Sequence, residues 1–314
     1  MSKVRVCFLG TPDFAVTCLK KLLDDEHFEV VGVVTQPDRP AGRKMVLSPT
    51  PVKSLAQARG LRVISPESLN QELIIQEVQK WNAEVAVVVA FGQIVSQKFL
   101  DSFHFGCVNV HASLLPRWRG AAPIQRAVEF GDTETGVCLQ KMVKELDAGD
   151  VIGARKILIT SNMNAKELFD ALAEKGADLL HIELMDYIRG NLAPLPQDSN
   201  FVTYAKKINK AEAEIKWDHS AEQIHNRIRA FVMGPGSWTL FQGKKLKVHR
   251  TRIKDLNQIS KTPGIITKVN PDSIEVATGK GILEILEVQA ESRNRQTLAE
   301  FLKGNPQKEG TRFG

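Results

Sequence analysis

The sequence predicts an α/β protein with two domains: a first domain built on a mostly parallel sheet, and a small β-barrel domain after it. Two observations lead to this prediction. Apolar runs typical of buried strands alternate with helical patterns over the first two thirds of the chain. Short strand patterns separated by turn residues fill the last third. The 314 residues are enough for two hydrophobic cores, and the 43% hydrophobic and 25% charged content is ordinary for globular proteins.

The first domain is expected over residues 1–189 and is Rossmann-like, because strands that alternate with helices at this spacing favour right-handed crossovers in a parallel sheet. Thr11 is expected to cap its first helix. Ligands of such sheets bind beyond the carboxyl ends of the strands, so residues that follow strand ends should line one crevice. The expected strands are 3–9, 28–35, 61–64, 85–90, 107–113, 135–143 and 151–159, and the expected helices are 14–23, 52–58, 70–80 and 164–189, the last as one helix or two.

A polar, proline-bearing stretch over residues 190–206 is expected to be a linker, and residues 207–314 are expected to form the second domain. Its pattern is typical of a small closed or partly open barrel, similar to an OB-fold. One basic strand pattern alternates so that Lys245, Lys247 and His249 share a face. The expected helix is 221–230, and the expected strands are 238–241, 245–252, 264–269, 273–277 and 282–288.

The positive charge is concentrated in the second domain. Residues 207–314 hold 19 Lys and Arg against 12 Asp and Glu, whereas the rest of the chain is close to neutral, so the net charge of +6 comes from this part. Such asymmetry favours a polyanionic partner, nucleic acid above all, for the second domain. A solvated basic surface with no partner is the alternative that charge alone leaves open.

Several classes of function are disfavoured. The first strand is followed by only one glycine, Gly10, so neither a dinucleotide-binding glycine pattern nor a phosphate-binding P-loop is present. No apolar run approaches the roughly 20 residues of a membrane span. The four cysteines show no metal-ligand spacing, so we expect reduced thiols, no metal, and a cytoplasmic protein.

The stretch 36–51 is a long, cationic loop whose prolines exclude a helix or a central strand. Long loops at the ligand end of a sheet are usually lids or binding loops, and a passive linker is the alternative.

The stretch 107–113 carries the candidate chemistry. Its alternation places Val108 and Val110 on one face and Asn109 and His111 on the other, where both polar side chains can reach one reacting atom. Asp147 lies in a glycine-containing turn, from which a carboxylate can orient a histidine. This set suits acyl transfer to an amine, with Asn109 donating to an oxyanion and His111 acting as a base or as a second charge stabiliser. Whether His111 or a water held by Asp147 takes the amine proton first stays open.

Other interpretations of these residues are weaker. Ser113 is the nearest hydroxyl, but the sequence around it has no G-x-S-x-G elbow, which disfavours a serine hydrolase. The remaining histidines are expected to be structural or at the surface: His27, His104, His181, His219, His225 and His249.

The pattern N-x-H-x-S-L-L-P-x-x-R-G over 109–120, with Asp147 downstream, resembles the signature of the folate-dependent formyltransferases. Three further stretches resemble the branch of that family that formylates methionyl-tRNA: F-L-G-T-P-D-F-A over 8–15, Q-P-D-R-P-A-G-R over 36–43, and L-P-R-W-R-G-A-A-P-I-Q over 115–125. The resemblance continues at 207–208, at Trp217 and 234–236, and at 301–304, so it covers the chain.

The resemblance implies 10-formyltetrahydrofolate as formyl donor, without a metal, and the methionine amino group of initiator Met-tRNA as acceptor. It implies catalytic roles for Asn109, His111 and Asp147, and a monomer that binds no membrane. The implied folate contacts are Phe91, Gly92, Gln93, Ile94, Ser113, Leu114, Leu115, Pro116, Lys144, Glu145 and Leu146. The expected tRNA contacts are Arg43, Lys44, Lys207, Lys245, Lys247 and Arg250.

Two rivals are weighed. One is formyl transfer to a small amine such as an amino sugar nucleotide, for which the cationic loop and the basic barrel would be dispensable. The other is a non-catalytic RNA-binding protein on a decayed enzyme fold, which predicts the loss of one of the three candidate catalytic residues, although all three are present.

Overall fold

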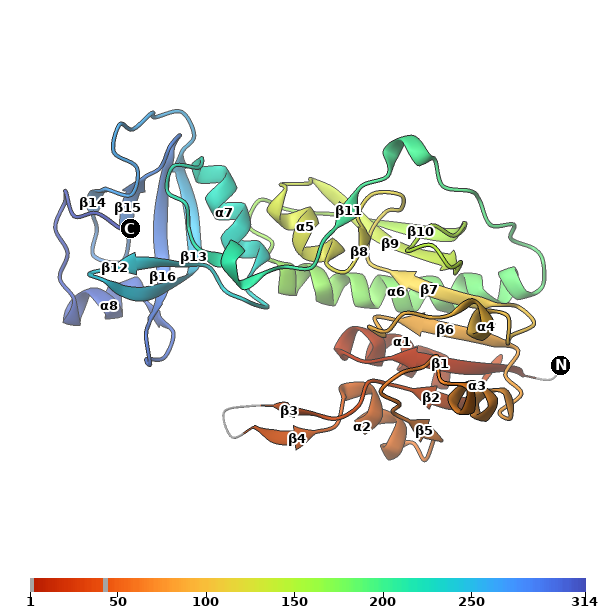
Figure 1. Ribbon diagram of the computed structural model, residues 1–314. Coiled ribbons are helices and arrows are strands. Elements are labelled where there is room, and N and C mark those ends of the chain that lie inside the picture. The colour runs from red at the N-terminus through yellow and green to blue at the C-terminus, as the bar shows by residue number, and fades with distance from the viewer. Residues whose placement is uncertain (1–2, 42–44) are drawn as a thin grey trace. The chain divides into compact units, whose positions relative to one another are not determined.

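The computed structural model describes residues 3–41 and 45–314, and its chain divides into two compact units (Figure 1). The first comprises Met1–Gly120, Thr135–Ile157 and Phe169–Ala205, and the second Ala121–Glu134, Leu158–Leu168 and Lys206–Gly314. The domain boundaries expected from the sequence, with the first domain over 1–189 and the second over 207–314, stay a prediction. In this division two segments before residue 190 belong to the second unit.

A seven-stranded sheet forms the first unit, in the order β10-β9-β7-β6-β1-β2-β5. Five neighbouring strands from β5 to β7 are parallel, and β9 is antiparallel to β7. The expected mostly parallel α/β sheet is therefore confirmed, and its order reverses between β1 and β6. The strands are β1 (Val4–Gly10), β2 (Phe28–Val34), β5 (Val63–Ile64), β6 (Val85–Val89), β7 (Cys107–His111), β9 (Glu134–Lys141) and β10 (Val151–Leu158).

Helices cover both faces of this sheet. On one face the ring of Phe14 meets that of Phe169 edge-on at 5.4 Å, and Gly176 lets α6 approach Val110 closely. On the other face a buried cluster joins α3 and α4 to the strands, with Ile75 and Phe99 among its members. The helices are α1 (Asp13–Leu23), α2 (Pro51–Ala58), α3 (Glu72–Gln79), α4 (Gln97–Leu100) and α6 (Ala165–Ile188), the last a single helix.

The expected cap of α1 is wrong. Pro12 occupies the N-cap position, and no side chain caps the helix. The hydroxyl of Thr11 instead donates to the carbonyl oxygen of Phe91 at 2.9 Å, so it links the ends of β1 and β6 at the point where the strand order reverses.

Short elements that the sequence did not predict complete the first unit. Within the loop 36–51, β3 (Arg39–Ala41) pairs with β4 (Val46–Ser48). The parallel pair β8 (Arg119–Gly120) and β11 (Tyr204–Ala205) holds the chain after β7. Gly120 is needed there because its φ is +116° and a Cβ would lie 2.9 Å from the oxygen of Ala205. A 3-10 turn, η1, spans Ser199–Phe201.

The second unit contains an antiparallel sheet in the order β12-β13-β16-β15-β14, with β17 on β16, as the expected antiparallel β domain requires. Closure into a barrel stays a prediction. Trp217 and Phe313 stack in its core at 5.6 Å. The elements are α5 (Pro123–Glu129), η2 (Lys210–Ala213), α7 (Ala221–Ala230), β12 (Trp238–Phe241), β13 (Lys244–Asp255), β14 (Ile266–Val269), β15 (Ile274–Ala277), β16 (Ile282–Ala290), β17 (Gln296–Thr297) and α8 (Leu298–Gly304).

Strand β13 departs from the simple alternation that its sequence suggests. Leu246 and Val248 are buried, but the pairing with β16 shifts between Val248 and Arg250. After this irregularity Thr251 is buried and Arg250 is exposed. The shift therefore keeps Arg250 outside the core on the same strand as Lys245 and Lys247.

Candidate active site

Strand β7 brings the candidate residues to the carboxyl end of the sheet. Asn109 pairs in register with Val88 of β6 on one side and with Gln140 of β9 on the other. Its side chain is partly exposed and has no hydrogen-bond partner among the described residues. The amide N–H groups of Asn109 are thus available to a substrate oxygen.

The imidazole of His111 is buried, with 6% of the residue exposed, and its orientation is fixed by a backbone group. Its Nε2 lies 3.0 Å from the carbonyl oxygen of Trp118. Because a carbonyl oxygen only accepts, this bond places the proton on Nε2 and leaves the lone pair of a neutral ring on Nδ1. Nδ1 faces Oδ1 of Asp147 at 3.7 Å.

The carboxylate of Asp147 is held from two sides. Oδ2 accepts a hydrogen bond of 2.7 Å from the backbone N–H of Gly120, and Oδ1 accepts one of 3.1 Å from Nε2 of Gln140. The other amide atom of Gln140, Oε1, is buried without a partner among the described residues. This unpaired acceptor lies on the strand position opposite Asn109, where a bound ligand would satisfy it.

The loop that carries Asp147 is anchored by Gln197. Nε2 of Gln197 donates to the carbonyl oxygens of Asp147 at 2.8 Å and of Gly149 at 2.6 Å. Its Oε1 accepts from Nε and from a terminal nitrogen of Arg119 at 3.0 and 2.7 Å. Gln197 falls in the stretch expected to be a linker, so that stretch supports the candidate site.

Left-handed backbone conformations surround the site. Ala90, Trp118 and Asp147 have φ values of 45°, 63° and 49°, a region that residues other than glycine seldom adopt and that bulky side chains avoid. Such residues collect at functional sites because the surroundings hold them there. The left-handed Trp118 supplies the carbonyl that orients His111.

The residues expected to contact folate after β6 lie beside β7, because β6 and β7 are neighbours. The carbonyl oxygen of Phe91 accepts from the side chains of Thr11 and Gln36. The amide of Gln93 braces the loop, donating to Pro66 and accepting from Leu69. Gly92 is left-handed at φ +85°, and Ile94 is 84% exposed. Their contact with folate stays a prediction.

The second expected group follows β7 and forms a tight turn. Ser113 is fully buried, and its hydroxyl donates to the carbonyl oxygen of Arg117 at 2.6 Å, which removes it as a nucleophile. Leu114 packs close to Gly136, and the N–H of Leu115 points to the Cys138 sulfur. Pro116 is partly exposed.

A cavity of about 740 Å³ within the first unit adds residues that sequence reasoning missed. Lys144 and Glu145 are the expected folate contacts that line it, and Leu146 beside them is 64% exposed. The cavity lies at the start of β7, at the end of that strand away from His111. Most of its walls come from α4, from the start of β7 and from the chain after β9: Gln97, Leu100, Asp101, Phe103, His104, Phe105, Gly106, Cys107, Lys141, Met142, Val143 and Tyr187.

Two groups of this cavity, the buried Cys107 and the half-buried Tyr187, are uncharged at neutral pH. Burial, with a smaller effect of Asp101, raises the pKa of the Cys107 thiol. Burial also raises the pKa of Tyr187, whose hydroxyl donates to the carbonyl oxygen of Phe105. The apolar residues spaced along 99–107 were a signal for this cavity in the sequence. Only the fold shows that the stretch 99–107 faces residues 141–145.

The expected tRNA contacts belong to other parts of the chain. Arg43 and Lys44 lie outside the described residues. Lys207, Lys245 and Lys247 are exposed in the second unit, and the ammonium of Lys245 lies 4.3 Å from the Trp238 ring centre.

The segment before Lys207 is tied to α5 by a buried guanidinium. Arg126 donates to the carbonyl oxygen of Lys206 at 3.1 Å and to the carboxylates of Glu129 and Glu212 at 2.6 and 2.7 Å. The pKa of Arg126 is raised because these carboxylates outweigh the lowering effect of burial. This network fixes the backbone just before Lys207, whose side chain is exposed.

Two kinds of feature are missing from residues 3–41 and 45–314. No three His, Cys, Asp or Glu side chains in that part of the chain are grouped as metal ligands. None of its helices has the length and apolar character needed to cross a bilayer.

Comparison with known proteins gives consistent matches along the chain. Residues 3–183 match the formyl transferase family model, and residues 207–306 match the model of the formyl transferase C-terminal domain. The chain is 65% identical over 317 residues to a methionyl-tRNA formyltransferase of Bdellovibrio bacteriovorus, with 100% of each chain covered. It is 42% identical over 298 residues to the methionyl-tRNA formyltransferase of Hydrogenovibrio crunogenus, with 95% of each covered.

Among solved structures, an N-formyltransferase of Helicobacter canadensis in complex with folinic acid and dTDP-3-aminofucose shares the fold. The TM-score is 0.67 at 20% identity, over 92% of this chain and 100% of that one.

Proposed function

The chain belongs to the methionyl-tRNA formyltransferases, and from that premise we propose that Asn109, His111 and Asp147 carry the transfer of a formyl group to initiator Met-tRNA. The enzyme formylates the α-amino group of methionine, for translation initiation. When bound, 10-formyltetrahydrofolate supplies the formyl group. The observation that carries the assignment of residues is the His111 ring, held between the carbonyl oxygen of Trp118 and the carboxylate of Asp147.

The donor fits the residues that are present. The turn after β6, the turn after β7 and the loop of Asp147 lie around Asn109 and His111 at the carboxyl ends of the parallel strands, where ligands of such sheets bind. The unpaired Oε1 of Gln140 provides a buried acceptor next to the reacting region. We therefore propose that the folate lies against the Phe91–Ile94 and Ser113–Pro116 turns and the Lys144–Leu146 loop, next to Asn109 and His111, and not in the cavity at the start of β7.

Asn109 donates its amide N–H to the formyl oxygen as that oxygen gains negative charge. A fixed donor at this point stabilises the transition state more than the ground state. His111 accepts the proton of the attacking amine on Nδ1, since Nε2 already carries the proton shared with Trp118. Asp147, 3.7 Å from Nδ1, stabilises the imidazolium that results. The imidazolium then gives its proton to the tetrahydrofolate nitrogen as the bond between that nitrogen and the formyl carbon breaks.

The basic residues of the second unit support its role as the RNA surface. Lys245, Lys247 and Arg250 are exposed on β13, and Lys207 follows the segment that Arg126 fixes. Cations of this kind neutralise backbone phosphates. We extend the proposal to Arg43 and Lys44 on the cationic loop, and to a monomer in the cytoplasm. All candidate catalytic side chains come from one chain, and the four cysteines are free and buried.

One assay tests the function and its rival. The enzyme is given 10-formyltetrahydrofolate with charged initiator Met-tRNA, uncharged tRNA, free methionine and an amino sugar nucleotide in parallel. Product is expected only on the charged initiator. Formylation of the sugar nucleotide, with none on Met-tRNA, would overturn the substrate in favour of the small-amine alternative.

A further inference from the structure

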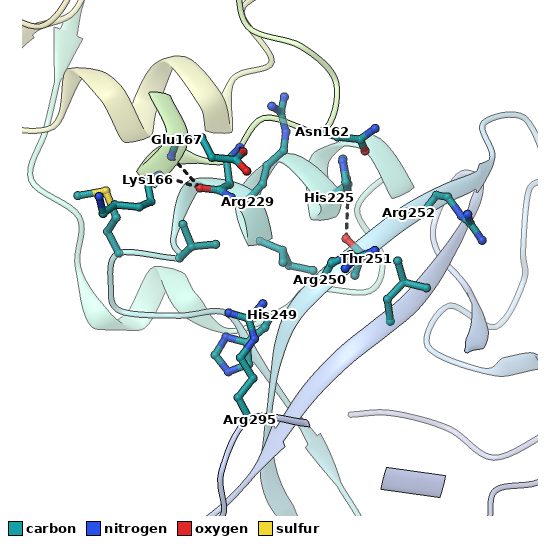
Figure 2. A pocket seen from close by; sticks show the side chains of 15 residues that line it. Asn162, Lys166, Glu167, His225, Arg229, His249, Arg250, Thr251, Arg252 and Arg295 are labelled. Carbon is teal, nitrogen blue, oxygen red and sulfur yellow. Dashed lines mark hydrogen bonds between the residues drawn. The ribbon is translucent and has the colours of Figure 1, made fainter. Parts of the chain in front are cut away.

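A second pocket, of about 940 Å³, lies within the second unit, and of its lining residues only Arg250 has a role above (Figure 2). Its walls come from 158–168, from α7, from β13 and from the chain before β17. Its lining holds five Lys and Arg and one carboxylate, and of these cations Arg252 is paired with Glu284, which is not part of the lining. The lining residues are Asn162, Asn164, Lys166, Glu167, His225, Ile228, Arg229, Val232, Met233, His249, Arg250, Thr251, Arg252, Leu286 and Arg295.

One wall of this basic pocket is formed by Arg229 of α7, of which only 8% is exposed. Its guanidinium donates to Oδ1 of Asn226 at 3.0 and 2.9 Å, and to the carbonyl oxygens of Thr160 at 3.1 Å and Met163 at 2.7 Å. All these acceptors are neutral, and no carboxylate of the described chain forms an ion pair with Arg229. Four of the five N–H donors are used, so a buried positive charge keeps one donor for a ligand.

Buried cations in proteins are normally paired, because leaving water costs the charge its solvation. Arg229 forms no ion pair among the described residues, and the network that holds it fixes the guanidinium in place. The charge of Glu222 favours the charged guanidinium, but burial outweighs it and lowers the pKa of Arg229. A rigid, buried guanidinium without an ion pair on the wall of a pocket is what an anion site requires.

The rim adds further positive charge. Arg250 lies 3.3 Å from Glu287, and Nε of Arg295 donates to the same carboxylate at 2.7 Å. One carboxylate therefore serves two guanidinium groups, which leaves a net positive charge. The register shift of β13 is what turns Arg250 out of the core and Thr251 into it.

The remaining polar groups do not offset this charge. Nε2 of His225 donates to the carbonyl oxygen of Ser161. Nδ1 of His225 lies 2.9 Å from the hydroxyl oxygen of Thr251, a contact that Figure 2 shows. The carboxylate of Glu167 accepts the N–H of Asn164 at 2.9 Å at the start of α6. Among the described lining residues no phenyl, phenol or indole ring offers a base a stacking surface.

We propose that this pocket binds a phosphate group of the tRNA backbone, with Arg229 as the buried anion-binding residue and Arg250 and Arg295 at the rim. The proposal rests on the function above, which makes tRNA the substrate. Guanidinium groups match the paired oxygens of a phosphate, and the absence of a stacking ring in the described lining favours backbone over base. The sequence-independent contact would orient the RNA without reading it.

The test measures binding of labelled initiator Met-tRNA over a salt series. R250Q/R295Q removes two exposed rim cations, and K268Q, at an exposed position of β14 outside the pocket, is the control with the same kind of change. We expect about tenfold weaker binding for the rim variant, with a salt slope smaller by about 0.9 for each phosphate that the variant no longer neutralises. K268Q should match the wild type. R229M should act like the rim variant, with thermal unfolding checked alongside.

A second arm separates the sources of phosphate. Inorganic phosphate is titrated calorimetrically into the wild type and the rim variant without RNA. Saturable phosphate binding that disappears in the rim variant, with a tRNA slope equal to that of K268Q, would overturn the RNA contact. Equal tRNA affinity and slope in all the variants would overturn it as well.

Formylation assays on the same preparations keep the two proposals apart. Product on Met-tRNA with unchanged salt slopes refutes the pocket and the place of Arg250 on the RNA surface, and leaves the formylation of Met-tRNA standing. A changed slope without any product refutes only the proposed function.

Discussion

Replacing Gln197 by alanine tests whether the stretch 190–206 supports catalysis. The change removes two hydrogen bonds to the loop of Asp147, at 2.8 and 2.6 Å, and two from Arg119, at 3.0 and 2.7 Å. Net contributions of about 1 kcal/mol for each bond to the loop give a loss of roughly 2 kcal/mol, because the side chain is only partly exposed. We expect kcat/KM to fall by about 30-fold if that energy holds Asp147 against His111.

Steady-state formylation of Met-tRNA measures the effect, with urea unfolding to detect a general loss of stability. Gln197→Glu sharpens the test, since a carboxylate accepts from Arg119 but cannot donate to the carbonyl oxygens of Asp147 and Gly149. It should be at least as impaired as the alanine variant. Asn200→Ala is the control in the same segment, because its exposed side chain makes no hydrogen bond within the described residues. Wild-type kcat/KM in both Gln197 variants would refute the supporting role.

Three further predictions concern other parts of the chain. Asn109→Ala and His111→Ala should each lower single-turnover formylation by about two to three orders of magnitude, and near-normal rates would contradict their roles. Phe313→Ala should lower the free energy of unfolding by about 3 kcal/mol, since it removes a buried ring stacked on Trp217, and guanidinium unfolding measures this. Burial raises the pKa of Asp25, but hydrogen bonds from two histidines lower it below its usual value. Asp25→Asn should therefore be less stable by about 1 kcal/mol near neutral pH, a difference that vanishes as pH falls through the folded pKa, and unfolding over a pH series checks it.

The sequence predicted the elements whose patterns are local. The helix at 221–230 has the predicted bounds, and the strand at 107–111 presents Asn109 and His111 as alternation requires. The branch of the family also followed from local motifs. Signals of this kind survive folding because the period of burial is set by strand and helix geometry.

The groups that hold the candidate site could not be predicted in this way, because they act through backbone atoms and distant pairings. The carbonyl of Trp118 orients His111 only because Trp118 adopts a left-handed conformation, which nothing in a tryptophan side chain signals. Gln197 reaches the Asp147 loop from a stretch whose prolines and polar residues are typical of a linker.

The register shift in β13 shows the same limit and also its consequence for function. Strict alternation along β13 would bury Arg250 and expose Thr251. The register of its pairing with β16 shifts after Val248, so Arg250 is exposed and Thr251 is buried instead. A buried arginine at 250 would need a partner inside the core, whereas the exposed one stands beside Arg295 on the rim of the basic pocket. The irregularity thus converts a strand pattern that predicts one basic face into a cationic rim that a phosphate group can reach. A local change of register, more than the number of lysines and arginines, decides where on the second unit the positive charge is usable.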